Sequence, residues 1–318
     1  MTEIGIGLIG GGYMGKAHAV AYAAVAAVFN TPLRPTLEMI AATSPQSAEA
    51  YRKAYGFARA AQDWQDLVAD PKVGAVIIAS PQSTHRAIAE AAFAAGKPVF
   101  CEKPLGASLG EARAMVAAAE ASGLPNMIGF NYVRTPATQF VRHLLAEGAI
   151  GTVTWFRGEH TEDFLADPTL PATWRTTGRA NGTMGDLAPH PINCTLALMG
   201  DIAELSARIE TIHHSRPSPE GPRAVDNDDH AQLMLRFASG AGPPRLCRLL
   251  SGTGAWHRLS GPDHHRGAGF PDRHCHGATG LADVSGRACR GADHRHRLQG
   301  RGGRPLAQRP ERLKGAGS

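Results

Sequence analysis

Two side chains capable of acid–base chemistry lie close together in the second half of the sequence. Asp186 and His190 are four residues apart in the run 182–190. If this run is helical, the two side chains share one face of the helix. A carboxylate beside an imidazole can orient the ring and raise its basicity, which suits general-base catalysis. The same spacing also occurs in ordinary surface contacts, so it leaves both interpretations open.

A third candidate, Lys103, directly follows a short apolar run. It lies in Glu102-Lys103-Pro104 after the strand-like residues 99–101. The proline restricts the backbone before it, and ligands of doubly wound sheets bind at the carboxyl ends of strands. A lysine fixed there could stabilise negative charge on a reacting oxygen. An ordinary surface lysine is the alternative.

The loop 80–85 follows another apolar run, residues 73–79. A continuous apolar run is typical of a parallel strand that is buried on both faces. The loop therefore lies where such a sheet binds ligands. His85 at its end, taken alone, is more typical of a packing or capping histidine.

The elements that position these groups begin at the first turn of the chain. A strand-like run, residues 4–9, leads into Gly10, Gly12 and Gly15, and a helix follows from Ala17. This order is the dinucleotide-binding fingerprint. The first glycine permits a tight turn, the second lets the backbone approach a pyrophosphate, and the third lets the helix pack on the strand. The helix N-terminus then offers free N–H groups to the phosphates.

The second strand, residues 37–43, bears on the choice of cofactor. In many such folds an acid at its end binds the ribose hydroxyls. Here Ser44 follows the strand, and Arg52 and Lys53 lie on the next helix. A small donor and cations suit the extra phosphate of NADP, so the sequence slightly favours NADP over NAD. A solvated helix face explains the two cations equally well.

These motifs together resemble one enzyme family. The Gly10–Gly15 turn, Ser80-Pro81 with His85, and Glu102-Lys103-Pro104 are similar at these separations to the glucose–fructose oxidoreductase/inositol dehydrogenase (Gfo/Idh/MocA) family. Residues 131–136 and 148–151 extend the likeness. Asp186 and His190 match the family's D-x-G-x-H motif in type and spacing, with Ala188 in place of the glycine.

The resemblance implies an α/β protein of two domains. Residues 1–128 are expected to form a Rossmann-type doubly wound parallel sheet. Residues 129–241 are expected to form an α+β substrate domain with an open, largely antiparallel sheet. The implied reaction is hydride transfer from a secondary CH–OH of a sugar or cyclic polyol to NAD or NADP. A non-catalytic NAD(P)-binding protein is the alternative function.

The family also implies roles for individual residues. His190 would take the hydroxyl proton, Asp186 would orient or tune it, and Lys103 would hold the same oxygen. Substrate contacts are expected from Asn131, Tyr132, Arg175 and Asn193. Cofactor contacts are expected from Gly10, Gly12, Tyr13, Met14, Gly15, Ser44, Ser80, Pro81, His85, Glu102 and Lys103. No metal is expected, and intact relatives are expected to form homo-oligomers through the second-domain sheet.

The composition changes near residue 242. Residues 241–318 hold 14 of the 33 basic residues and five of the 28 acidic ones, so the remainder of the chain is mildly acidic. That acidic part gives no reason to expect nucleic acid. No run is long and apolar enough to span a membrane, so a cytoplasmic protein is expected. The five cysteines form no C-x-x-C pair.

Three interpretations of residues 242–318 are open. His274-Cys275-His276 hints at metal binding, and the charge suits an acidic partner. The loss of apolar periodicity, with abundant Arg, Gly, Ala, Pro and His, favours a tail translated out of frame. On that interpretation no run here is a central strand, and the strand 230–237 is left at an unpaired edge of an incomplete sheet.

Overall fold

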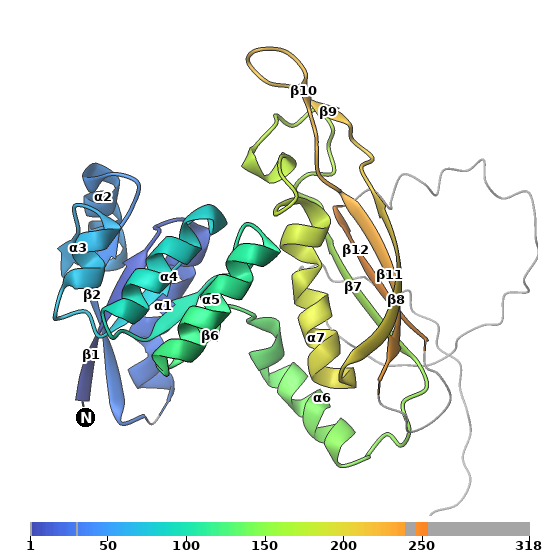
Figure 1. Cartoon of the computed structure of the whole chain (residues 1–318), viewed down its shortest axis with the longest axis horizontal. Helices are drawn as coiled ribbons and strands as arrows, with labels where there is room; N and C mark the ends of the chain where they lie inside the picture. The colour runs from blue at the N-terminus through green and yellow to red at the C-terminus, as the bar shows by residue number, and fades with distance from the viewer. Residues whose placement is uncertain (1, 30, 239–245, 254–318) are drawn as a thin grey trace, which may run out of the picture. The chain divides into compact units, whose positions relative to one another are not determined.

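The computed structural model describes residues 2–29, 31–238 and 246–253. Its first domain is built on a six-stranded sheet in the order β3-β2-β1-β4-β5-β6 (Figure 1). All neighbouring strands are parallel. The strands are β1 (Thr2–Ile9), β2 (Leu33–Ala41), β3 (Arg59–Ala60), β4 (Ala75–Ile78), β5 (Val99–Cys101) and β6 (Asn126–Ile128). The strand order reverses between β1 and β4, which is where doubly wound sheets bind ligands.

Helices cover both faces of this sheet. They are α1 (Tyr13–Val28), α2 (Pro45–Tyr55), α3 (Trp64–Ala69), α4 (His85–Ala94) and α5 (Leu109–Ser122), with a short 3-10 turn, η1 (Gln82–Thr84). Alternate residues of β4 enter two separate cores. Val76 and Ile78 pack with residues of α3, α4 and α5, whereas Ile77 packs on the side of α1 and α2. Burial on both faces explains why residues 73–79 form a continuous apolar run.

The second domain contains a four-stranded sheet in the order β7-β12-β11-β8. Its strands are β7 (Phe156–Glu162), β8 (Ile202–Glu210), β11 (His230–Phe237) and β12 (Leu246–Thr253). β11 pairs antiparallel with both β8 and β12, whereas β12 pairs parallel with β7. Figure 1 shows α7 (Pro189–Met199) running along one face of this sheet. There Leu233 and Leu235 of β11 pack against Ile192 and Met199 of α7.

Shorter elements connect these parts of the second domain. They are η2 (Tyr132–Arg134), α6 (Pro136–Ala146), η3 (Trp174–Thr176), η4 (Thr183–Leu187) and the two-strand hairpin β9 (Ser215–Arg216) and β10 (Arg223–Ala224). The segment η4 is a π-helical turn, so the run 182–190 is not one continuous α-helix.

The prediction that no run beyond residue 242 is a central strand is wrong. β12 lies between β7 and β11, with Leu249 opposite both Leu233 and Gly158. β11 is therefore no edge strand. The basic composition of the whole segment hid this eight-residue run, which begins Leu-Cys-Arg-Leu-Leu. His274-Cys275-His276 and the rest of residues 254–318 lie outside the described residues.

Candidate functional site

The glycines of the first turn differ in the reason why each position suits glycine. Gly10 has a φ of +103°, and a Cβ there would lie 2.4 Å from the Ala79 carbonyl oxygen. A Cβ at Gly15 would lie 2.1 Å from the Gly10 carbonyl oxygen, so the packing of α1 requires glycine. Gly12 has an ordinary φ of −68°, and a Cβ there would meet nothing within 4 Å. The protein itself therefore does not require glycine at position 12, whereas a ligand that touches the backbone does.

The surroundings of this turn fit a dinucleotide. The hydroxyl of Tyr55 donates to the Gly11 carbonyl oxygen at 2.6 Å, which braces the loop from α2. Among the described residues no side chain caps the N-terminus of α1, which leaves its first N–H groups available to an anion. Tyr13 is exposed beside them and Met14 is half-buried. Tyr55 was not among the residues predicted to form the site.

The groups that favoured NADP are occupied within the protein. The Ser44 hydroxyl accepts a hydrogen bond from the Ser47 backbone N–H, which caps α2. The Arg52 guanidinium donates to both carboxylate oxygens of Glu49, at 2.7 and 2.8 Å. Lys53 lies 3.5 Å from the same carboxylate. The sequence-based preference for NADP therefore has no structural support.

His85 joins two loops instead of facing a ligand. Its side chain is buried, with Nε2 2.8 Å from the Ser80 carbonyl oxygen and Nδ1 3.2 Å from that of Pro104. The imidazole thus ties the loop after β4 to the loop that carries Lys103. It was predicted to contact the cofactor, and the structure instead gives it the packing role that the sequence left as the alternative.

Glu102 is held by a histidine that sequence analysis missed. His18 of α1 places Nε2 2.7 Å from a carboxylate oxygen of the buried Glu102, and His18 itself is partly buried. The Lys103 backbone N–H donates to the other oxygen at 3.3 Å. His18 also packs edge-on against Phe100, with ring centroids 4.8 Å apart. The only feature of the sequence that could have pointed to His18 is that it is a single imidazole in an Ala-rich helix.

Lys103 and Asp186, 83 residues apart, meet at the centre of the site. The Lys103 ammonium donates to Asp186 Oδ1 and to its backbone carbonyl oxygen, both at 2.7 Å. Arg175 binds the other carboxylate oxygen of Asp186. The Arg175 guanidinium also lies over the Trp174 ring, 4.3 Å from its centroid. Both carboxylate oxygens are thus engaged, and among the described residues no hydrogen bond joins Asp186 to His190.

His190 is instead surrounded by aromatic rings. Its ring centroid lies 4.7 Å from that of Tyr132, 5.7 Å from that of His160 and 6.4 Å from that of Phe130. Its Nδ1 is buried without a hydrogen-bond partner in the described part of the chain. Burial, the Lys103 charge and His160 lower the pKa of His190 to about 4, against the opposing charges of Asp186 and Glu102. His190 is therefore a neutral base near pH 7.

The predicted substrate residues are placed unequally. Tyr132 contacts His190, and Arg175 contacts Asp186. Asn193 lies in the same helix as His190, and its Oδ1 is buried without a partner among the residues that the structure describes. Asn131 is exposed. His160 was not predicted, because nothing in the local sequence links it to His190.

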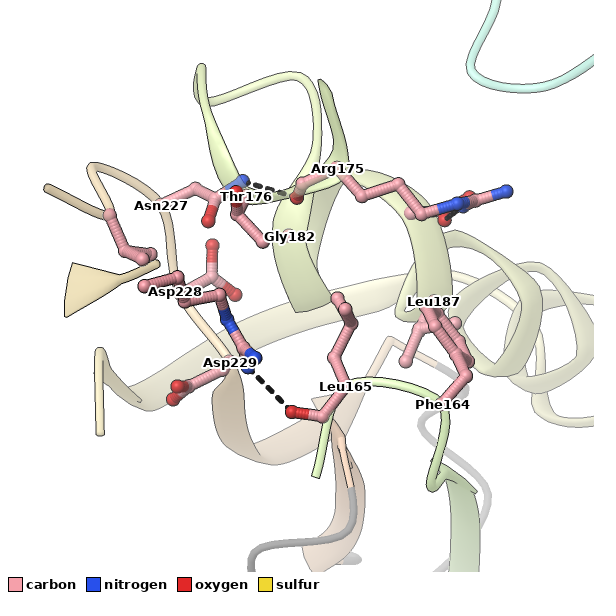
Figure 2. A pocket seen from close by; sticks show the side chains of 12 residues that line it. Phe164, Leu165, Arg175, Thr176, Gly182, Leu187, Asn227, Asp228 and Asp229 are labelled. Carbon is pink, nitrogen blue, oxygen red and sulfur yellow. Dashed lines mark hydrogen bonds and ion pairs between the residues drawn. The ribbon is translucent and has the colours of Figure 1, made fainter. Parts of the chain in front are cut away.

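A pocket in the second domain adjoins Arg175 and Asp186. Figure 2 shows Asn227 bonded to the Arg175 carbonyl oxygen, at 2.8 Å. Next to it, Asp228 accepts a hydrogen bond from the Met184 backbone N–H at 2.7 Å. Burial raises the pKa of the Asp228 carboxyl group. The segment before β11 thus fixes both the loop of Arg175 and the turn that carries Asp186.

Comparison with known proteins shows the family of this chain. Residues 4–130 match the NAD-binding Rossmann fold of the oxidoreductase family, and residues 138–242 match the Gfo/Idh/MocA C-terminal domain. The chain belongs to the Gfo/Idh/MocA family. The resemblance predicted from the sequence is confirmed, as is the two-domain fold class that it implied. The matched family fold binds NAD. Two features of the first turn suit that ligand: the uncapped N-terminus of α1 and the open space at Gly12.

Family members with assigned activities resemble much of the chain. Levoglucosan dehydrogenase from Pseudarthrobacter phenanthrenivorans is 38% identical over 258 residues, which are 76% of this chain and 66% of that protein. Inositol 2-dehydrogenase from Acidothermus cellulolyticus is 34% identical over 178 residues, 55% of this chain and 48% of that protein. The chain thus spans less than two thirds of these relatives.

A solved family structure supports the same relationship. Levoglucosan dehydrogenase in complex with NADH and L-sorbose superposes with a TM-score of 0.76 at 37% identity, over 80% of this chain and 68% of that chain.

In the described part of our structure, no helix is long and apolar enough to cross a membrane. The same residues contain no group of three or more potential metal ligands.

Proposed function

We propose that this chain is an NAD-dependent dehydrogenase that oxidises a secondary alcohol of a sugar or cyclic polyol. The contact of Lys103 with Asp186 beside a neutral His190 carries the proposal. It places a cation and a base together, as removal of a hydroxyl proton requires. Relatives that act on levoglucosan and inositol point to the same substrate class.

In the proposed reaction, His190 accepts the proton of the substrate hydroxyl. Its pKa of about 4 leaves it unprotonated over most of the pH range in which proteins are stable. Lys103 donates a hydrogen bond to the same oxygen as negative charge develops there. Asp186 and Arg175 keep the ammonium in place. The nicotinamide ring, when bound, accepts the hydride.

The cofactor in this proposal is NAD. The free backbone at Gly12 and α1 suits a pyrophosphate, whereas Arg52 is already paired with Glu49. A levoglucosan dehydrogenase also forms a complex with NADH. Fluorescence titration should therefore give tighter binding of NADH than of NADPH. Glu49→Gln releases Arg52 and should narrow that difference.

The substrate is proposed to lie against Tyr132 and Asn193. Tyr132 is exposed beside His190, and the Asn193 amide offers an oxygen that lacks a partner in the described residues. An amide can both donate to and accept from a sugar hydroxyl. We also propose a homo-oligomer through the second-domain sheet, which exposes Leu205, Ile209 and Met234. Light scattering of the full chain tests that assembly.

The activity is tested by following NADH formation with the full chain and a panel of levoglucosan, inositols, L-sorbose and simple alcohols. The proposal predicts turnover with at least one cyclic polyol or sugar, and none with short monoalcohols. NADH binding without turnover on any member of the panel would contradict the dehydrogenase activity. It would favour a non-catalytic NAD-binding protein instead.

A further inference from the structure

His160, which the proposed reaction does not use, packs face to face against His190. The two ring centroids lie 5.7 Å apart with an interplanar angle of 17°. His160 projects from β7, and its side chain is 16% exposed. We propose that His160 is a positioning residue that holds the His190 ring and whose own charge opposes a second positive charge on that ring. This inference rests on the proposed role of His190 as the base.

Ring packing takes the place of the hydrogen bond that usually orients a catalytic imidazole. Such a bond normally joins one ring nitrogen to a carboxylate or a carbonyl oxygen. His190 Nδ1 has no such partner in the described residues, and Asp186 is engaged elsewhere. The edge of Tyr132 instead meets both imidazoles, at 4.7 Å from His190 and 5.7 Å from His160. The three rings form a closed cluster that restricts rotation of His190.

His160 acts on His190 through space. The two rings lie nearly parallel, and His190 Nδ1 has no hydrogen-bond partner among the described residues. Two imidazolium ions so close in a half-buried site repel each other, so protonated His160 disfavours protonation of His190. The Glu162 carboxylate lies 3.4 Å from His160 Nε2. The titratable and charged groups that face His190 are Glu102, Lys103, Tyr132, His160 and Asp186.

Two substitutions separate the charge of His160 from its packing. His160→Phe keeps a flat ring against His190 and removes the charge. His160→Gln removes both the charge and the ring. Tyr132→Phe is the matched control, because it keeps the edge contact and changes no charge. NMR titration of the His190 ring in the full chain, assigned with His190→Gln, reports its protonation without any need for turnover.

The inference predicts that the His190 titration midpoint rises by about one pH unit in His160→Phe. Tyr132→Phe should leave that midpoint unchanged. The pH at which kcat/KM falls on the acid side should likewise be higher in His160→Phe than in the wild type. kcat near pH 7 should be kept in His160→Phe and should fall several-fold in His160→Gln, which loses the ring contact.

The outcomes are distinguishable from failure of the proposed function. An unchanged His190 midpoint in both folded His160 variants would overturn the inference, whatever the enzyme activity. A raised midpoint without turnover of any sugar or polyol would retain the role of His160 and contradict the dehydrogenase. If His160→Phe unfolds, the midpoint in His160→Gln decides.

Discussion

At the scale of single residues, the site is defined by groups that the fold leaves unused. Gly12 is not demanded by local packing, Asn193 keeps a buried oxygen without a partner in the described residues, and His190 is neutral. Sequence motifs singled out Lys103, and in the structure Asp186 contacts this lysine 83 residues away. The π-helical turn and a contact between residues 83 positions apart are not visible in local spacing. His18 and His160 were missed for the same reason.

The two glycines of the first turn should respond differently to substitution. Gly12→Val places a side chain where nothing in the protein lies, so the fold should persist while NADH affinity falls at least about tenfold. Gly15→Ala forces a Cβ to 2.1 Å from the Gly10 carbonyl oxygen. It should lower the free energy of unfolding by roughly 1–3 kcal/mol. Fluorescence titration and urea unfolding check both variants. Undiminished NADH affinity in Gly12→Val would contradict the proposal that the dinucleotide binds at this turn.

His190 should make stability depend on pH. Its pKa of about 4 in the folded chain lies below the ordinary value of 6.5, so the unfolded chain binds more protons between these pH values. The contribution of His190 to the free energy of unfolding is therefore fully present above about pH 6.5 and is lost as pH falls toward 4. The loss should be on the order of 2 kcal/mol, because the ring is only partly buried.

Urea unfolding at pH 7 and near pH 4 measures this loss. The variant His190→Gln should lose less stability over that interval than the wild type, since glutamine does not titrate. The other acidic groups titrate alike in both proteins, so the difference isolates His190. Identical pH dependence in the two proteins would show that burial does not depress the pKa of this imidazole.

At the scale of elements, the sequence predicted the first domain well and the second incompletely. Buried parallel strands such as β4 and β5 are recognisable in the sequence as apolar runs, and Gly56 ends α2 in a left-handed conformation. β12 was missed because composition was averaged over a long basic segment. Its pairing partners β7 and β11 are distant in sequence, and only the assembled sheet shows the need for it.

Leu249→Pro tests the place of β12 between two strands. Proline removes a backbone donor, and its ring is not tolerated within a central strand. The amides of β7 and β11 should then lose much of their protection in hydrogen exchange. Val76–Ile78 of the first domain serve as the internal control and should stay protected. Unchanged protection in β7 and β11 would contradict the pairing of β12 with these strands and would indicate that β11 is an edge strand.

At the scale of the whole molecule, two family domains supply complementary parts of one site. The first domain carries the glycine turn and Lys103, and the second carries Asp186 and His190. Family likeness, not composition, predicted that these parts belong together, because each motif alone has an ordinary structural explanation. The chain spans 66% of its levoglucosan dehydrogenase relative, so its own turnover is the property to measure.

The most direct test compares NADH formation by the wild type, Lys103→Ala and His190→Ala on the sugar or polyol that the wild type oxidises. Each variant should lose about 10²–10⁴-fold in kcat, because each removes a group that acts on the reacting hydroxyl. NADH affinity should stay near the wild-type value, since Gly12 and the N-terminus of α1 are unchanged. Wild-type turnover in either variant would contradict the account of the site.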